Sequence, residues 1–305
     1  MNNQYKISRL SDENFNDFHI DKILDLDLVN KEAIKKAKLN VVIDAVNSTG
    51  GFMIPKLLEK LGVSYHKLYC EPNGIFPHNP EPLAENLSEI STQVISNGSQ
   101  LGIVVDPDVD RLAIVCEDGS MFGEEYTLVS VADYILSKKR GSTVSNLSST
   151  RALKDITEKY GCNYFPSAVG EVNVVECMKI NNAVIGGEGN GGVILPDLHY
   201  GRDALVGIAL FLSLYAEKGL KASVLRDSYP KYYMKKNKIE LDDENKIQNV
   251  FDYLLSEYDY AHINKIDGVK FDFENGWVHV RRSNTEPIIR ICLLYTSPSP
   301  RDGSI

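Results

Sequence analysis

The chain has 305 residues, of which 43% are hydrophobic and 25% charged, and its formal net charge is −9. This length allows two or three domains of ordinary globular composition, and the negative charge argues against a partner that is nucleic acid or a membrane. Five scattered cysteines without a C-x-x-C pair predict reduced thiols in a cytoplasmic protein. No signal peptide opens the chain, and its longest apolar run, residues 204–212, is too short to cross a bilayer.

The first part of the chain alternates predicted strands and helices. Residues 1–37 are polar with weak helical patterning, and we expect a linker and a remnant of a preceding domain there. Strands are predicted near residues 41–44, 65–69 and 101–105, with helices between them. This order favours a parallel or mixed sheet covered by helices, so we expect residues 38–121 to form an α/β domain.

A loop with three aspartates lies between two β-branched apolar runs, residues 101–105 and 112–115. Asp106, Asp108 and Asp110 alternate, so an extended loop can turn all three toward one point. At about 4 Å and an effective dielectric near 20, each pair repels by roughly 4 kcal/mol, and a hard cation such as Mg²⁺ would relieve this. A solvated acidic turn is the alternative. A calcium-binding loop is excluded, because Arg111 stands where that loop needs glycine.

Residues 122–227 repeat the alternation and predict a second α/β domain. Asp203 is expected to cap an apolar helix that begins at residue 204 and ends before Gly219. Residues 186–192 are predicted as a glycine-rich loop in which Glu188 and Asn190 offer polar atoms to sugar hydroxyls. A dinucleotide site is disfavoured because no helix start follows the glycines, and a flexible turn remains an alternative.

The remainder predicts a smaller α+β domain over residues 228–292, from one amphipathic helix and two hairpin turns in an antiparallel sheet. A group of hydrogen-bond donors follows its strands and matches the oxygens of a phosphate: Arg281, Ser283, Asn284 and Thr285. A solvated basic strand end is the alternative. Residues 293–305 show no periodicity and are expected to be a foreign or disordered tail.

These motifs resemble, in order, those of the α-D-phosphohexomutases, which include phosphoglucomutase, phosphomannomutase and phosphoglucosamine mutase. Residues 106–111 resemble the metal loop of that family and residues 187–191 its sugar loop, where serine is commoner than Asn190. Arg281 with residues 283–287 resembles its phosphate-binding loop. The resemblance covers the second, third and most of the fourth of the family's four domains.

The resemblance implies an intramolecular phosphotransferase that moves a phosphoryl group between O1 and O6 of a hexose through a phosphoserine and a bisphosphate intermediate. It implies Mg²⁺ ligands at Asp106, Asp108 and Asp110, with Arg111 as a catalytic residue beside the transferred group. It also implies that Glu188 and Asn190 bind the ring hydroxyls of the substrate. The phosphate that does not react would be bound by Arg281, Ser283, Asn284 and Thr285.

No loop in the chain resembles the phosphoserine loop of the family's first domain, so we expect a fragment that is inactive in isolation. Residues 145–147 and 167–171 favour phosphoglucosamine as the substrate, with mannose and glucose phosphates as alternatives. Two other functions remain open. One is a catalytically silent fragment that binds Mg²⁺ and a phosphosugar, and the other is a phosphatase with Asp106 as its nucleophile.

Overall fold

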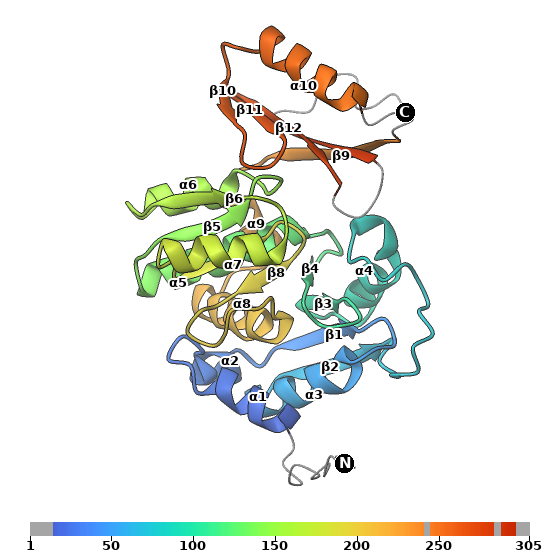
Figure 1. Ribbon diagram of the computed structural model, residues 1–305. Coiled ribbons are helices and arrows are strands. Elements are labelled where there is room, and N and C mark those ends of the chain that lie inside the picture. The colour runs from blue at the N-terminus through green and yellow to red at the C-terminus, as the bar shows by residue number, and fades with distance from the viewer. Residues whose placement is uncertain (1–14, 241–244, 284–287, 297–305) are drawn as a thin grey trace, which may run out of the picture.

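The structure, a computed structural model, describes residues 15–240, 245–283 and 288–296. They form three sheets that follow one another along the chain, and helices pack around the first two (Figure 1). Over these ranges, every helix is too short or too polar to span a bilayer. The predicted class is confirmed: two mixed α/β sheets are followed by an antiparallel sheet.

The first sheet has the order β2-β1-β3-β4, in which only β4 runs antiparallel to its neighbour. Its strands are β1 (Asn40–Asp44), β2 (Ser64–Leu68), β3 (Leu101–Val105) and β4 (Leu112–Cys116). The accompanying helices are α3 (Gly50–Leu61), the 3-10 helix η1 (Ala84–Asn86) and α4 (Ser88–Ser96). Side chains alternate across β3, so that Ile103 enters the main core and Val104 packs in a smaller cluster with Val94 of α4. Burial of both faces explains why β3 and β4 are apolar throughout.

The second sheet repeats this topology in the order β6-β5-β7-β8, with β8 as the antiparallel edge strand. Its strands are β5 (Thr143–Asn146), β6 (Tyr164–Ser167), β7 (Ile185–Glu188) and β8 (Gly192–Ile194). The helices of this part are α5 (Glu124–Lys138), α6 (Ala152–Lys159) and α7 (Glu171–Ile180).

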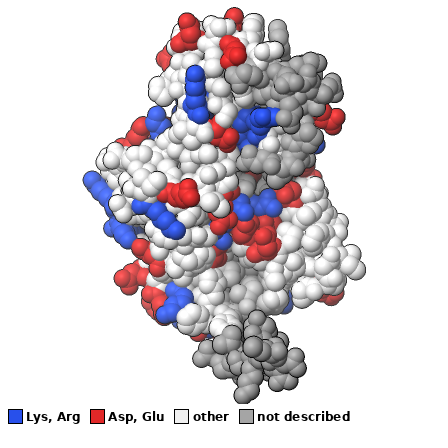
Figure 2. Space-filling model, in the orientation of Figure 1, with Lys and Arg blue, Asp and Glu red and all other residues white. Residues whose placement is uncertain are grey.

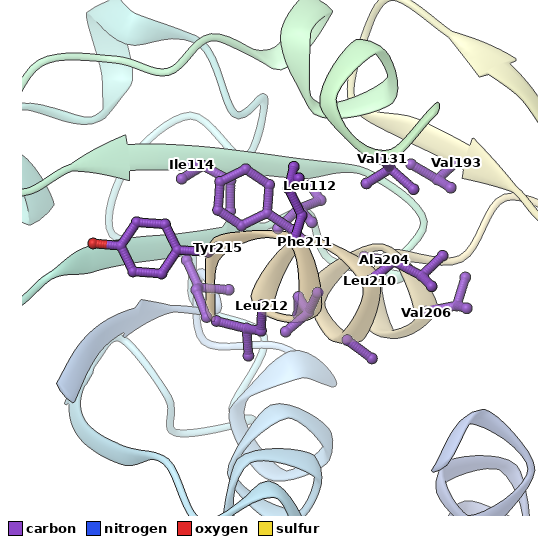
Figure 3. Packing of buried hydrophobic residues seen from close by; sticks show 14 of the residues in the cluster. Leu112, Ile114, Val131, Val193, Ala204, Val206, Leu210, Phe211, Leu212 and Tyr215 are labelled. Carbon is purple, nitrogen blue, oxygen red and sulfur yellow. The ribbon is translucent and has the colours of Figure 1, made fainter. Parts of the chain in front are cut away.

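The apolar helix α8 (Ala204–Lys218) lies in the main core between the two sheets, followed by the short helix α9 (Ala222–Asp227). As predicted, Asp203 caps α8, since its side chain accepts hydrogen bonds from two N–H groups of the first turn, and Gly219 ends it in a left-handed conformation. Phe211 points at Leu112 and Ile114 of β4 (Figure 3) and meets Phe122 edge-to-face at 5.1 Å. Burial on all sides of residues 204–215 explains why that part of α8 is almost entirely apolar.

Residues 15–37, the described part of the segment that we predicted as a linker and a remnant of a preceding domain, contain two helices. They are α1 (Phe15–Leu24) and α2 (Lys31–Ala37). Ile20, Ile23 and Ile34 are fully buried in the main core, and both helices contact α8. Residues 15–24 and 31–37 are therefore packed helix rather than linker.

The third sheet is antiparallel throughout, in the order β10-β11-β12-β13-β9. Its elements are β9 (Tyr233–Glu240), α10 (Asn245–Glu257), β10 (His262–Asn264), β11 (Val269–Phe273), β12 (Gly276–Arg282) and β13 (Ile288–Tyr295). Phe251 and Leu254 of α10 pack on Val280 and Ile289, so the amphipathic helix covers one face of this sheet.

Strand β13 includes residues 293–295, the start of the segment predicted as a foreign or disordered tail, so these residues are ordered. Leu293, Leu294 and Tyr295 lie in the strand and pair with β12 on one side and β9 on the other. The backbone of these residues therefore pairs with a strand on both sides. The apolar pair Leu293–Leu294 favours a strand that packs against neighbouring strands. The rest of the predicted tail, residues 297–305, lies outside the described residues.

Candidate functional site

The acidic turn joins β3 to β4, and its first aspartate holds it together. Asp106 is fully buried, and its Oδ1 atom accepts hydrogen bonds from the backbone N–H groups of Asp110 and Arg111, each 3.0 Å long. Its carbonyl oxygen accepts the N–H of Val109, which takes a left-handed φ of 61°. The turn gathers one carboxylate oxygen from each of Asp106, Asp108 and Asp110 within 4.8 Å of one another.

The electrostatics of this trio fit a cation. Burial and the neighbouring Asp106 raise the pKa of Asp110 to about 7, and Asp110 Oδ1 is buried without a hydrogen bond. Burial would also raise the pKa of Asp106, but the hydrogen bond from Arg111 holds it below its usual value. Converging carboxylates with one unsatisfied buried oxygen suit a hard divalent ion with oxygen ligands, so these residues could hold Mg²⁺.

Arg111 donates hydrogen bonds to two acids, and its Nε also lies 3.6 Å from Asp110 Oδ1. Its Nε donates to Asp106 Oδ2 at 2.6 Å, and its two terminal nitrogens donate to the carboxylate of Glu81, Nη2 at 3.2 Å. These bonds bring the proline-rich loop, residues 76–82, next to the acidic turn. We predicted no role for Glu81, because nothing in the sequence links it to a residue thirty positions away.

The glycine-rich segment is a hairpin rather than the predicted loop. Residues 185–188 form β7, residues 192–194 form β8, and only residues 189–191 turn between them. Gly191 has φ 91°, and a Cβ there would lie 2.4 Å from the carbonyl oxygen of Leu112. The N–H of Leu112 donates to the Gly191 carbonyl at 3.0 Å, and the backbone of Arg111 forms an isolated antiparallel β-bridge with Gly192. At Gly191, then, glycine is needed for close packing against β4.

Glu188 ends β7 and is buried with three donors around it. Its Oε1 accepts Asn146 Nδ2 at 2.8 Å and the N–H of Gly170 at 3.1 Å, and its Oε2 accepts Arg202 Nη1 at 2.8 Å. Asn190 is half-buried in the turn, where its Oδ1 accepts the N–H of Gly192 at 3.2 Å. Both predicted sugar-binding residues thus lie in one hairpin whose polar atoms are already held in place.

Arg202 connects the acidic turn with this hairpin. Its guanidinium donates to Asp110 and to Glu188, and its Nε lies 3.1 Å from a carboxylate oxygen of Glu171. We missed Arg202, since only its position beside the helix cap Asp203 could have singled it out. Acidic and basic residues gather in the middle of the face shown in Figure 2, below the third sheet.

The predicted phosphate cluster is described in part. Arg281 lies in β12 and is mostly buried, with its Nη1 donating to the carbonyl of Arg282 at 3.1 Å. Ser283 follows the strand, its N–H donating to the Ile288 carbonyl at 2.9 Å. Asn284 and Thr285 lie outside the described residues.

Asp267 connects this cluster with the sugar hairpin. Arg281 Nε lies 4.0 Å from Asp267 Oδ2, which accepts the N–H of Val169 at 3.1 Å. The next N–H, that of Gly170, donates to Glu188. Among described residues the contact between Arg281 and Glu188 is indirect, and it passes through the loop at residues 168–170.

Comparison with known proteins identifies the arrangement. Three domain models of phosphoglucomutase/phosphomannomutase match consecutive parts of the chain: alpha/beta/alpha domain II over residues 17–119, alpha/beta/alpha domain III over 123–233, and the C-terminal domain over 233–293. The chain belongs to this family.

Curated relatives and solved structures of the phosphoglucomutase/phosphomannomutase family agree with this. A phosphoglucomutase/phosphomannomutase of Thermococcus kodakarensis is 38% identical over 86% of this chain and 58% of its own length. A probable phosphoglucosamine mutase of Methanopyrus kandleri is 32% identical over 92% of this chain and 62% of its own. The crystal structure of a family protein from Burkholderia thailandensis matches with a TM-score of 0.80 and 26% identity, over 92% of this chain and 60% of that one.

This phosphoglucomutase/phosphomannomutase family chain thus spans about three-fifths of the length of those relatives. The matched models are the second, third and fourth domains of the family.

Proposed function

We propose that the chain supplies the metal-, sugar- and phosphate-binding parts of a phosphohexomutase, which interconverts hexose 1-phosphate and hexose 6-phosphate. The observation that carries this proposal is the bridge made by Arg202, whose one guanidinium contacts both Asp110 of the acidic turn and Glu188 of the hairpin. A bridge of this kind fixes the spacing of two loops, and positioning is the main contribution of a protein to phosphoryl transfer.

In this proposal Asp106, Asp108 and Asp110 would hold Mg²⁺. When bound, the ion supplies positive charge that offsets the negative charge of a transferring phosphoryl group. Arg111 would contact the same group after releasing Glu81, whose side chain is 48% exposed and therefore free to turn into solvent.

The sugar would lie against the hairpin and its phosphate against the third sheet. Glu188 and Asn190 would accept hydrogen bonds from ring hydroxyls. Arg281 of β12 and Ser283 after it, together with Asn284 and Thr285, would anchor the phosphate that does not react. Clamping this remote group would provide binding energy that orients the reacting end.

The phosphoryl donor would be a phosphoserine in a first domain, as in the family mechanism. Its phosphoryl group would pass to a sugar hydroxyl, giving a bisphosphate, and the other phosphate would then return to the serine. The chain alone should therefore bind hexose phosphate without turnover. Adding the first domain of the Thermococcus kodakarensis relative as a separate chain should give turnover.

A coupled mutase assay with and without that added domain tests the proposal. Serine-to-alanine exchange in the added domain is the matched control and should abolish any restored turnover. Turnover by the chain alone would refute the need for a separate phosphoserine.

We infer that the substrate is a hexosamine phosphate. Glu171 is the first residue of α7; its carboxylate lies 3.1 Å from Arg202 Nε and is 36% exposed, so it would offer a carboxylate to an amino sugar. Calorimetry should give tighter binding of glucosamine 6-phosphate than of mannose 6-phosphate, and Glu171→Gln should remove the difference. Equal affinities in the parent chain would contradict this inference.

A phosphatase with Asp106 as nucleophile is the alternative from another enzyme class. Asp106 accepts hydrogen bonds from two backbone N–H groups and from Arg111, so both its oxygens are engaged, which disfavours attack on phosphorus. Trapping a phosphoaspartate at Asp106 would reverse this preference.

A reducing compartment such as the cytoplasm suits the protein. All five cysteines are free thiols, two of them buried.

A further inference from the structure

Two histidines and one aspartate, none of them assigned to the proposed mutase site, lie close together. His19 comes from α1, His199 from the turn after β8, and Asp203 from the cap of α8. We propose that these three residues bind a divalent transition-metal ion of the Zn²⁺ class. This inference does not depend on the proposed mutase function.

The geometry suits such an ion. His19 Nε2 lies 2.8 Å from Asp203 Oδ2, and His199 Nε2 lies 3.1 Å from the same oxygen. All three ligand atoms lie within 4.8 Å of one another. Tetrahedral zinc with bonds of about 2.0–2.2 Å spaces its ligand atoms roughly 3.3 Å apart, so small side-chain rotations would admit it.

Neighbouring backbone groups also orient the carboxylate of this site. Asp203 Oδ1 is occupied by the N–H groups of Leu205 and Val206 at 2.8 and 3.1 Å, which leaves Oδ2 turned toward the imidazoles. Hydrogen-bonded carboxylates of this kind orient metal ligands. Asp203 is 7% exposed, whereas His19 and His199 are 34% and 42% exposed, so an ion and a fourth water ligand could enter from solvent.

The donor set separates this site from the acidic turn. Two imidazole nitrogens and one carboxylate suit zinc, cobalt or nickel, whereas the all-carboxylate turn suits magnesium. An ion here would join α1 to the start of α8. The N–H of Ala204, the first residue of α8, donates to the carbonyl of Val109 in the acidic turn. A metal ion bound at Asp203 would therefore also restrict the motion of that turn.

Zinc calorimetry on the full chain, in excess Mg²⁺, tests the proposal. The parent chain should bind one Zn²⁺, and His19→Gln and His199→Gln should each weaken binding by at least about tenfold, because loss of even a partner in the outer shell costs about 10- to 100-fold. His262→Gln, which changes an exposed histidine of β10, is the matched control and should bind as the parent does. Asp108→Asn should also leave Zn²⁺ binding unchanged.

Two further readouts make the outcome decisive. Co²⁺ in place of Zn²⁺ should give visible absorption of a low-coordinate ion with nitrogen ligands, and His199→Gln should lose it while keeping the parent's affinity for Mg²⁺. Circular dichroism establishes that the variants fold. Absence of Zn²⁺ binding in the parent, or histidine variants that bind as tightly as His262→Gln, would overturn the proposal.

Discussion

At the scale of single residues, the site depends on buried charges that compensate one another. Arg202 has three acidic partners and is 19% exposed, while Glu188 and Asp110 are 7% and 17% exposed. In such a network the loss of one member leaves the others unpaired in a medium of low polarity. In the proposed function, the same residue would serve both folding and ligand placement.

Replacing Arg202 with methionine should lower the free energy of unfolding by about 3 kcal/mol, because two partly buried carboxylates lose their counter-charge. Urea unfolding followed by circular dichroism measures this. Arg140→Met, at an exposed position after α5, should change the value by less than about 0.5 kcal/mol. Equal effects of the two variants would contradict the bridging role.

Asp108 is the exposed member of the carboxylate trio, so its replacement tests the metal assignment with little risk to folding. Asp108→Asn removes one negative ligand and should weaken Mg²⁺ binding by about tenfold or more, measured by calorimetry. Asp118→Asn, at the other end of β4, is the control and should leave Mg²⁺ affinity as it is. An unchanged affinity for Asp108→Asn would remove the aspartates from the metal site.

At the scale of elements, the hairpin β7–β8 packs so closely on β4 that a side chain at Gly191 would overlap the backbone of Leu112. Gly191→Ala should therefore lower the free energy of unfolding by at least about 2 kcal/mol, from the left-handed φ and the overlap together. Gly98 also has a positive φ, 59°, but open space around it, so Gly98→Ala should lose only about 1 kcal/mol. A thermal unfolding series separates the two contributions.

The elements also show how far the sequence allows prediction. The β-branched runs of β3 and β4 and the capped apolar helix α8 have local signals, and the structure contains them close to the predicted bounds. Residues 186–192, predicted as a glycine-rich loop after a strand, form most of the β7–β8 hairpin, and the reason for glycine at Gly191 lies in β4, far away in the sequence.

In the candidate site, too, residues with local sequence patterns were predictable and residues that depend on distant partners were not. The three aspartates and Glu188 carry local patterns, whereas Glu81 and Arg202 acquire a role only through partners 30 and 92 positions distant. Their pairing depends on the packing of whole domains, which no window of sequence contains.

At the scale of the whole molecule, several polar contacts join the third sheet to the second α/β part, and one of them includes a buried histidine. His279 of β12 is fully buried; its Nδ1 contacts Ser148 Oγ at 2.9 Å and its Nε2 contacts the Asp267 carbonyl at 2.7 Å. Burial is the main cause that lowers the pKa of His279 below 6.5, opposed by Asp267 and assisted by Lys270 and Arg281.

Because the unfolded chain takes up this proton at a higher pH than the folded one, His279 should reduce stability as the pH falls below about 6.5. The free energy of unfolding of the parent should therefore drop relative to His279→Gln between about pH 7 and pH 5. Urea titrations of both chains across that range measure the difference. If the free energy of unfolding of the parent instead rose relative to that of His279→Gln on acidification, the assignment would be contradicted.

The paired topology of the two α/β sheets has a consequence for solubility. Each sheet ends in an antiparallel edge strand, β4 or β8, and the bridge between Arg111 and Gly192 sets these two edges against each other. Exposed strand edges are templates for unwanted pairing between molecules. Parting these two edges would uncover both at once, so the contact between Arg111 and Gly192 also guards the protein against self-association.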